Sequence, residues 1–253
     1  MTALVLASAV ASAQNEMVAV PNRPTVSTTA QPVQAGVLET EWGVDAASSH
    51  QDVNDLFKFG LTSNFELRLG NILWTADSGT HGLGDTAVGF KYRLTRDSEH
   101  QPSVALMYML TAATATNMPG SAGPSHSFAF LASKDLGKHH FDFNLIGNLL
   151  ESRTGDFHHN FLNALAWSHP VRGKWGATAE ISGVTSAQRG LAGNAQFLTS
   201  AIYTPESRLV FDIGVMGRIA GEIPHAMFVA GVTYSVANLY HDHGHRQNSP
   251  ASF

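Results

Sequence analysis

Residues 57–70 read F-K-F-G-L-T-S-N-F-E-L-R-L-G, and residues 84–94 read G-D-T-A-V-G-F-K-Y-R-L; these two segments indicate the fold class. Apolar and polar residues alternate one for one in both parts, so that Phe57 and Phe59 fall on one side and Lys58 on the other. A repeat of two residues predicts a strand whose two faces meet different environments. One apolar face and one charged face are typical of a barrel with lipid outside and water or ion pairs inside.

The composition favours such a barrel over a soluble enzyme. Only 14% of the 253 residues are charged, compared with roughly 25% in soluble domains. The formal net charge of −5 leaves no basic patch to neutralise phosphates, so we expect no nucleic-acid partner. The chain has no cysteine, which excludes disulfides and thiolate chemistry.

Four segments are predicted along the chain. Residues 1–13 form an apolar run that ends in A-S-A, as in a secretory signal peptide. Residues 14–32 are rich in Pro, Thr, Ser and Asn and lack periodicity, which predicts an exposed N-terminal lead-in. Residues 33–237 form the barrel, and residues 238–253 form a polar, His-rich tail. No later stretch approaches the ~20 apolar residues of a transmembrane helix.

Twelve strands are predicted in the barrel. They lie near residues 33–46, 53–62, 64–75, 84–95, 102–114, 125–134, 138–150, 157–169, 174–185, 193–204, 207–218 and 225–237. Short turns alternate with longer Gly-rich loops, as at the periplasmic and extracellular ends of a bacterial barrel, which also requires an even strand number. We therefore predict an all-β, antiparallel transmembrane β-barrel of 12 strands with a polar lumen. A secreted β-sandwich is the alternative fold.

The charged faces of these strands supply the candidate site. The predicted lumen or ligand-binding residues are Glu39, Glu41, Lys58, Glu66, Arg68, Lys91, Arg93, Asp142, Glu180, Arg208 and Asp212. The residues predicted to face lipid are Phe57, Phe59, Leu67 and Phe90. Because the lumen charges have mixed signs, they describe either a polar pore or cross-strand ion pairs that fill the interior. The faces of the strands near 157–169 and 193–204 remain unassigned, since Asn, Gln and Thr interleave there with Phe and Leu.

Serine and histidine residues lie close together at two places in the chain, and histidines recur in the tail. Ser125-His126-Ser127 and Ser168-His169 bring serine and histidine together in sequence, but adjacency alone does not make a nucleophile and its base. His241, His243 and His245 alternate in the tail, where a solvated segment is favoured over a metal site. We expect no catalytic residue, no metal and no cofactor.

The chain also resembles a known family. F-G-L-T-S-N-F-E-L-R-L-G (59–70), G-L-G-D-T-A-V-G-F-K-Y-R-L (82–94) and T-P-E-S-R-L-V-F-D-I-G-V (204–215) are similar to outer-membrane proteins grouped under the MetA pathway of phenol degradation. The matching positions are Gly60, Glu66, Arg68, Gly84, Asp85, Lys91, Arg93 and Asp212. The resemblance implies a single-domain barrel in the bacterial outer membrane, linked to the degradation of aromatic compounds, with no catalytic motif.

Three functions follow as hypotheses. The first is an outer-membrane barrel, in contact with outer-membrane lipids, that binds or passes small apolar or aromatic molecules. The second is an outer-membrane lipid hydrolase, and the third is a structural barrel with a filled lumen and no transport.

Overall fold

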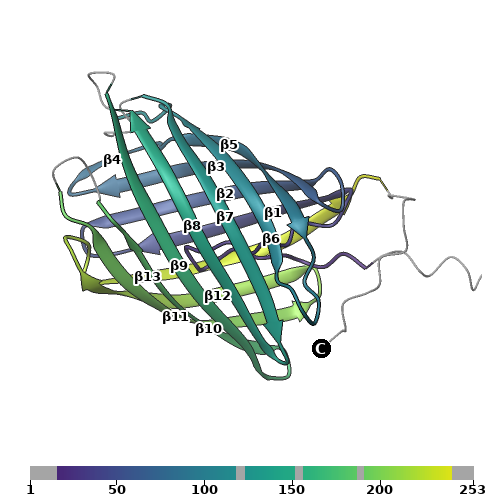
Figure 1. The fold of residues 1–253 in the computed structure, drawn as a ribbon. Coiled ribbons are helices and arrows are strands. Elements are labelled where there is room, and N and C mark those ends of the chain that lie inside the picture. Colours follow the sequence, from purple (N-terminus) through teal and green to yellow (C-terminus); the bar gives the residue numbers. More distant parts are fainter. Residues whose placement is uncertain (1–15, 118–122, 152–155, 187–190, 241–253) are drawn as a thin grey trace, which may run out of the picture.

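The computed structural model describes residues 16–117, 123–151, 156–186 and 191–240. It is an all-β structure in which twelve long strands close into an antiparallel barrel (Figure 1). The long strands are β1 (Val37–Ala46), β2 (His50–Gly60), β3 (Phe65–Asp77), β5 (Thr86–Thr95), β6 (Ser103–Ala112), β7 (Ser125–Leu136), β8 (His139–Glu151), β9 (Phe157–Arg172), β10 (Trp175–Val184), β11 (Asn194–Glu206), β12 (Leu209–Ala220) and β13 (Ala226–Asn238). The short β4 (Thr80–Gly82) pairs only with the end of β3.

The barrel closes where the last strand meets the first. β13 pairs with β1 over the full length of β1, and every other long strand pairs with its sequence neighbours. Two of the short turns contain a glycine with positive φ, Gly137 at +63° and Gly173 at +58°, a conformation that side chains disfavour. No helix in the described part of the chain is long and apolar enough to cross a membrane.

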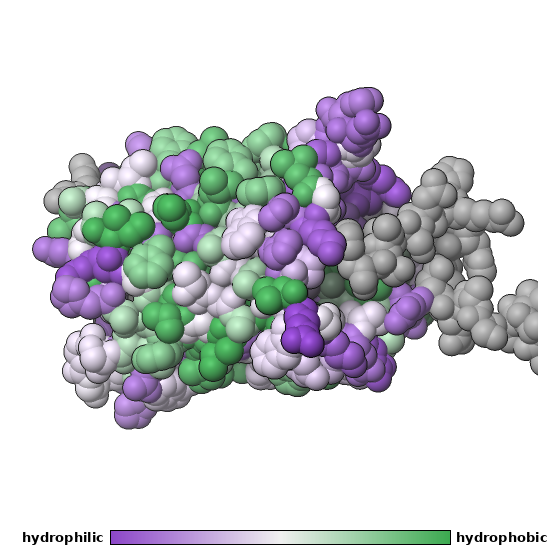
Figure 2. Space-filling model, turned by 90° about the horizontal axis from the view of Figure 1, so that it is seen from below, coloured by the Kyte–Doolittle hydropathy of each residue, from purple (hydrophilic) through white to green (hydrophobic). Residues whose placement is uncertain are grey.

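The period of two residues produces a wall with the predicted faces. Lys58 and Lys91 point inward and are buried, whereas Leu67 and Phe90 point outward and are exposed. Apolar side chains cover much of the outer wall, and hydrophilic ones gather toward its ends (Figure 2). The prediction of an all-β, 12-stranded barrel with a polar interior is confirmed.

Burial of the side chains assigns the faces of the two strands, β9 and β11, that the sequence left open. In β9, Asn160 and Ala164 are buried on the inner side, while Phe161 and Leu165 are exposed on the outer side. In β11, Leu198 faces inward and is buried. Sequence alone could not decide this, because β9 places small apolar residues inside and polar ones such as Asn163 outside.

The prediction of an exposed lead-in at 14–32 is wrong for the residues described. Residues 16–36 enter the barrel, with Glu16 and Val18 still exposed at its end and most of the others buried, and we call them the N-terminal plug. Its buried members include Asn22, Ser27, Thr28, Thr29, Ala30 and Val33. β1 consequently starts at Val37, four residues later than predicted. The predicted signal peptide (1–13) and the histidines of the tail (241–253) lie outside the described residues.

Candidate functional site: the plugged lumen

The N-terminal plug makes a loop through the lumen. It begins beside the short turn between β11 and β12, where the Ala19 amide donates to the Ser207 carbonyl (2.8 Å). It continues along the inner face of β1 to Arg23, whose guanidinium donates to Asp45 (3.2 Å). From there it crosses to β10, β8 and β7, and it returns to the start of β1. Because backbone amides and carbonyls inside a barrel need partners, the wall must supply them.

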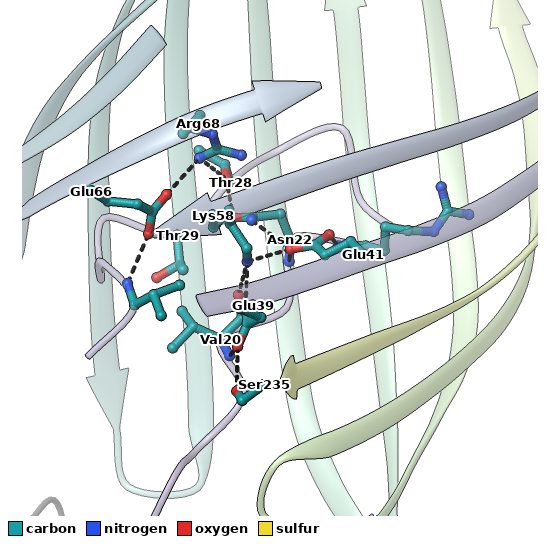
Figure 3. Close-up of polar contacts among 12 residues, drawn as sticks. Val20, Asn22, Thr28, Thr29, Glu39, Glu41, Lys58, Glu66, Arg68 and Ser235 are labelled. Carbon is teal, nitrogen blue, oxygen red and sulfur yellow. Dashed lines mark hydrogen bonds and ion pairs between the residues drawn. The ribbon is translucent and has the colours of Figure 1, made fainter. Parts of the chain in front are cut away.

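Lys58 is the centre of the first group of contacts. This lysine is 1% exposed and forms ion pairs with Glu39 (2.6 Å) and with Glu41. Glu39 also accepts the Val20 amide (2.9 Å) and Glu41 the Asn22 amide (3.0 Å), as Figure 3 shows. The same residues therefore neutralise one another and hold the plug.

Glu66 forms the second group on the neighbouring strands. It pairs with Arg68 (3.3 Å) and Lys91 (3.5 Å), and its other oxygen accepts the Val33 amide (2.7 Å). Lys91 donates to the carbonyl oxygens of two plug residues, Thr29 (3.0 Å) and Gln31 (2.9 Å). Hydrogen bonds with a charged partner are roughly twice as strong as neutral ones, so these contacts fix the path of the plug.

The opposite wall binds the middle of the plug. The two oxygens of Glu180 accept the amides of Val26 (2.9 Å) and Ser27 (2.7 Å). Asn144 uses both ends of its amide, accepting from the Thr28 amide (2.7 Å) and donating to the Thr28 carbonyl (2.9 Å). Contacts on both sides of the barrel mean that the plug spans the lumen.

The structure places nearly all the predicted site residues on the inner face. Glu39, Glu41, Lys58, Glu66, Arg68, Lys91, Arg93, Glu180 and Asp212 are buried there. Asp142 joins them through Ser133 Oγ (2.5 Å), and Arg93 donates to Gln31 of the plug. Arg208 is the exception: it lies at a short turn, over the ring of Tyr234 (5.2 Å), so its assignment to the lumen is wrong.

Sequence reasoning missed the plug and its neutral partners. Arg23, Ser133 and Asn144 belong to the network but were not among the candidates. One signal was available: residues 16–36 carry only Glu16 and Arg23 as charged residues, while the strands that follow carry many. A nearly uncharged segment of small residues beside an excess of inward charges is compatible with insertion into the lumen.

Two apolar clusters complete the lumen. Ala30 of the plug packs against Ala105 and Leu131, with Met107 and Ile146 beside them. The second cluster joins Val26 of the plug to Leu198, Met216, Met227 and Val229. Methionine adapts its shape to different neighbours. The interior thus combines a charged sector on β1 to β5 with apolar sectors on β6 to β8 and β11 to β13.

The serine and histidine residues considered for catalysis lie apart. Ser127 hydrogen-bonds to Asn148 (2.6 Å) inside the barrel, whereas His126 hydrogen-bonds to Tyr108 (2.8 Å) on the outer face. Ser168 hydrogen-bonds to Thr178 (2.9 Å) on one side of the wall, and His169 stacks on the ring of Trp167 on the other side. Each histidine therefore points away from the serine next to it, and neither pair forms a nucleophile with its base.

We predict that Lys58→Met destabilises the protein by about 3–5 kcal/mol, since it leaves two buried carboxylates without their cation. Urea unfolding in detergent measures the change, and cleavage by proteinase K after an apolar plug residue such as Val26 reports release of the plug. Arg208→Gln is the matched control, because an exposed pair such as Arg208 with Glu206 contributes about 0–1 kcal/mol. Equal effects of the two changes would contradict the role of Lys58.

The comparisons with known proteins support an outer-membrane barrel. No family model and no curated protein matches the chain. Among solved structures, an outer membrane channel from Pseudomonas putida F1 is 12% identical, with a TM-score of 0.62, over 81% of this chain and 97% of its own. The KdgM porin, solved with disordered oligogalacturonate, is 10% identical (TM-score 0.59; 79% and 99% covered). The NanC porin is 9% identical (TM-score 0.57; 79% and 100% covered).

At these identities the similarity shows the fold. The resemblance is confirmed at the level of the barrel shared by bacterial outer-membrane channels, and its link to phenol degradation remains a prediction. The apolar outer wall agrees with that location, because a barrel in the outer membrane exposes an apolar band to lipid. The chain therefore has the fold of the barrels of the bacterial outer membrane, with twelve long strands and an apolar outer wall suited to lipid.

Proposed function

We propose that this protein passes small, apolar or aromatic molecules across the outer membrane, through a lumen that the N-terminal plug controls. The observation that carries the proposal is the plug itself, because it spans the lumen and is held by side chains of the wall. The apolar sectors beside Ala30 and Val26 support an apolar cargo, since they offer it a surface next to the plug.

A structural barrel is the second candidate, and the same network favours it. Glu39, Glu66 and Glu180 each accept plug amides, and the other oxygens of Glu39 and Glu66 form ion pairs with wall cations, so the charges of the interior are neutralised with the plug in place. The two candidates differ in one respect, which is whether the plug must move. A channel requires the plug to shift when a molecule passes, whereas a structural barrel does not.

A reversible cross-link tests this difference. Thr29 Oγ1 of the plug lies 3.1 Å from Ser133 Oγ on β7, and the chain has no cysteine of its own. Thr29→Cys/Ser133→Cys should form a disulfide that fixes the plug to the wall. We expect oxidised protein in planar bilayers to pass no toluene-sized solute and little current, and reductant to restore both.

The single variants Thr29→Cys and Ser133→Cys are the controls, because they should not respond to oxidant or reductant. Equal passage in the oxidised and reduced double variant would mean that the plug does not control the lumen. No passage in any state, including the unmodified protein, would favour the structural barrel.

A further inference from the structure

Arg23 is held in a small acidic recess of the barrel wall. Its Nη1 donates to Asn54 (2.9 Å), and its Nη2 donates to Asp45 and to the Ala230 carbonyl (both 3.2 Å). Its Nε lies 3.8 Å from Asp212. We call this recess the Arg23 notch, formed by Gly43, Asp45, Asn54, Asp212 and Gly231. It is a site built for one guanidinium group.

Two glycines make room for that group. Gly43 of β1 and Gly231 of β13 face each other as register partners across the seam that closes the barrel. A Cβ atom at Gly43 would overlap the guanidinium carbon of Arg23, and one at Gly231 would overlap its Nε. A planar cation can therefore lie against the wall only because both positions lack side chains.

The notch has more acceptor capacity than Arg23 uses. Asp45 and Asp212 provide two carboxylates for one guanidinium. The Asp212 side chain is only 2% exposed, and neither its Oδ1 nor Arg23 Nε has a hydrogen-bond partner among the described residues. A guanidinium free of the plug backbone can turn toward Asp212 and form the two parallel bonds that Arg23 does not form.

The notch is reachable and has an apolar neighbour. The side chains of Arg23 and Asp45 are 13% and 22% exposed, so solvent reaches the notch. Val229 precedes Gly231 by two residues on β13, and it packs with Val26 of the plug. A ligand with a planar cationic head and a small apolar body would match both surfaces.

We propose that the Arg23 notch is a binding site for small organic cations with a guanidinium or amidinium head, which compete with Arg23 and so loosen the plug. The inference rests on the proposed channel function, and it names the class of molecule to which the lumen responds. The carboxylates of Asp45 and Asp212 bind the cationic head in the space that the two glycines leave open. The apolar cluster around Val26 contacts the body of the ligand.

Benzamidine is the probe, and benzamide is its neutral counterpart of nearly the same shape. Calorimetric titration of the purified full chain in detergent should show benzamidine binding to Arg23→Ala, in which the notch is free. Benzamide should not bind. Because Arg23 competes for the same place, the unmodified protein should bind benzamidine roughly tenfold more weakly than Arg23→Ala.

Two further variants test the two parts of the notch separately. Arg23→Ala/Asp212→Asn removes the buried carboxylate, and Arg23→Ala/Gly43→Ala fills the space while keeping both carboxylates. Each should weaken benzamidine binding by roughly tenfold or more relative to Arg23→Ala. Faster migration of unboiled samples in gels verifies that each variant is a folded barrel.

The site is overturned if Arg23→Ala does not bind benzamidine, if benzamide binds equally well, or if both double variants retain the affinity of Arg23→Ala. Calorimetry does not require passage, so the two proposals fail separately. Binding without any bilayer conductance overturns the channel and leaves the notch. Normal conductance without binding overturns the notch alone.

Discussion

Deleting residues 18–33 should raise the single-channel conductance several-fold. These residues form the part of the plug that crosses the lumen, from the neighbourhood of Glu39 to that of Glu66. The barrel should still fold, because its wall is held by the strand ladder and water can hydrate the charges that the plug leaves. Planar-bilayer recording measures the conductance of single barrels.

The control for the deletion is a variant that keeps the plug but weakens one contact. Lys91→Gln loses the ion pair with Glu66 while the plug remains in the lumen. It should therefore raise the conductance less than the deletion does. An unchanged conductance after deletion would mean that another part of the chain limits passage.

Phe90→Arg should strongly reduce assembly, whereas Lys91→Gln should leave assembly intact. Phe90 is 38% exposed on the outer wall and stacks on Phe65 (5.5 Å between ring centroids). An arginine on the lipid face costs about 2–4 kcal/mol at the bilayer midplane. Lys91 points inward, where the glutamine amide can still donate to a plug carbonyl and Arg68 still pairs with Glu66.

Two measurements distinguish the effects of Phe90→Arg and Lys91→Gln. Outer-membrane fractions give the amount assembled, and the difference in gel migration between unboiled and boiled samples gives the folded share. We expect little folded Phe90→Arg and normal amounts of folded Lys91→Gln. Similar assembly defects in both would show that the two faces of β5 do not meet lipid and lumen as described.

Most of the fold could be predicted from the sequence because it depends on a local pattern. Where one face of a strand is apolar throughout, alternation such as that of Phe57 with Lys58 predicts which residues form the strand, to within a few residues. It also predicts which side of the wall each side chain faces. Most candidate lumen residues were found in the same way. β9 and β11 gave no such pattern, and Arg208 was misplaced because its position in a turn ends the alternation.

A local alternation of residue types is thus enough to predict a barrel of twelve strands with its charges turned inward. What those charges contact depends on how the whole chain folds. The plug has no periodicity, and its partners Asn144 and Glu180 lie 116 and 154 residues away from Thr28 and Val26. A backbone segment in a closed interior takes the path on which its amides and carbonyls find partners. That path depends on the spatial arrangement of strands from the whole chain, which no local stretch of sequence specifies.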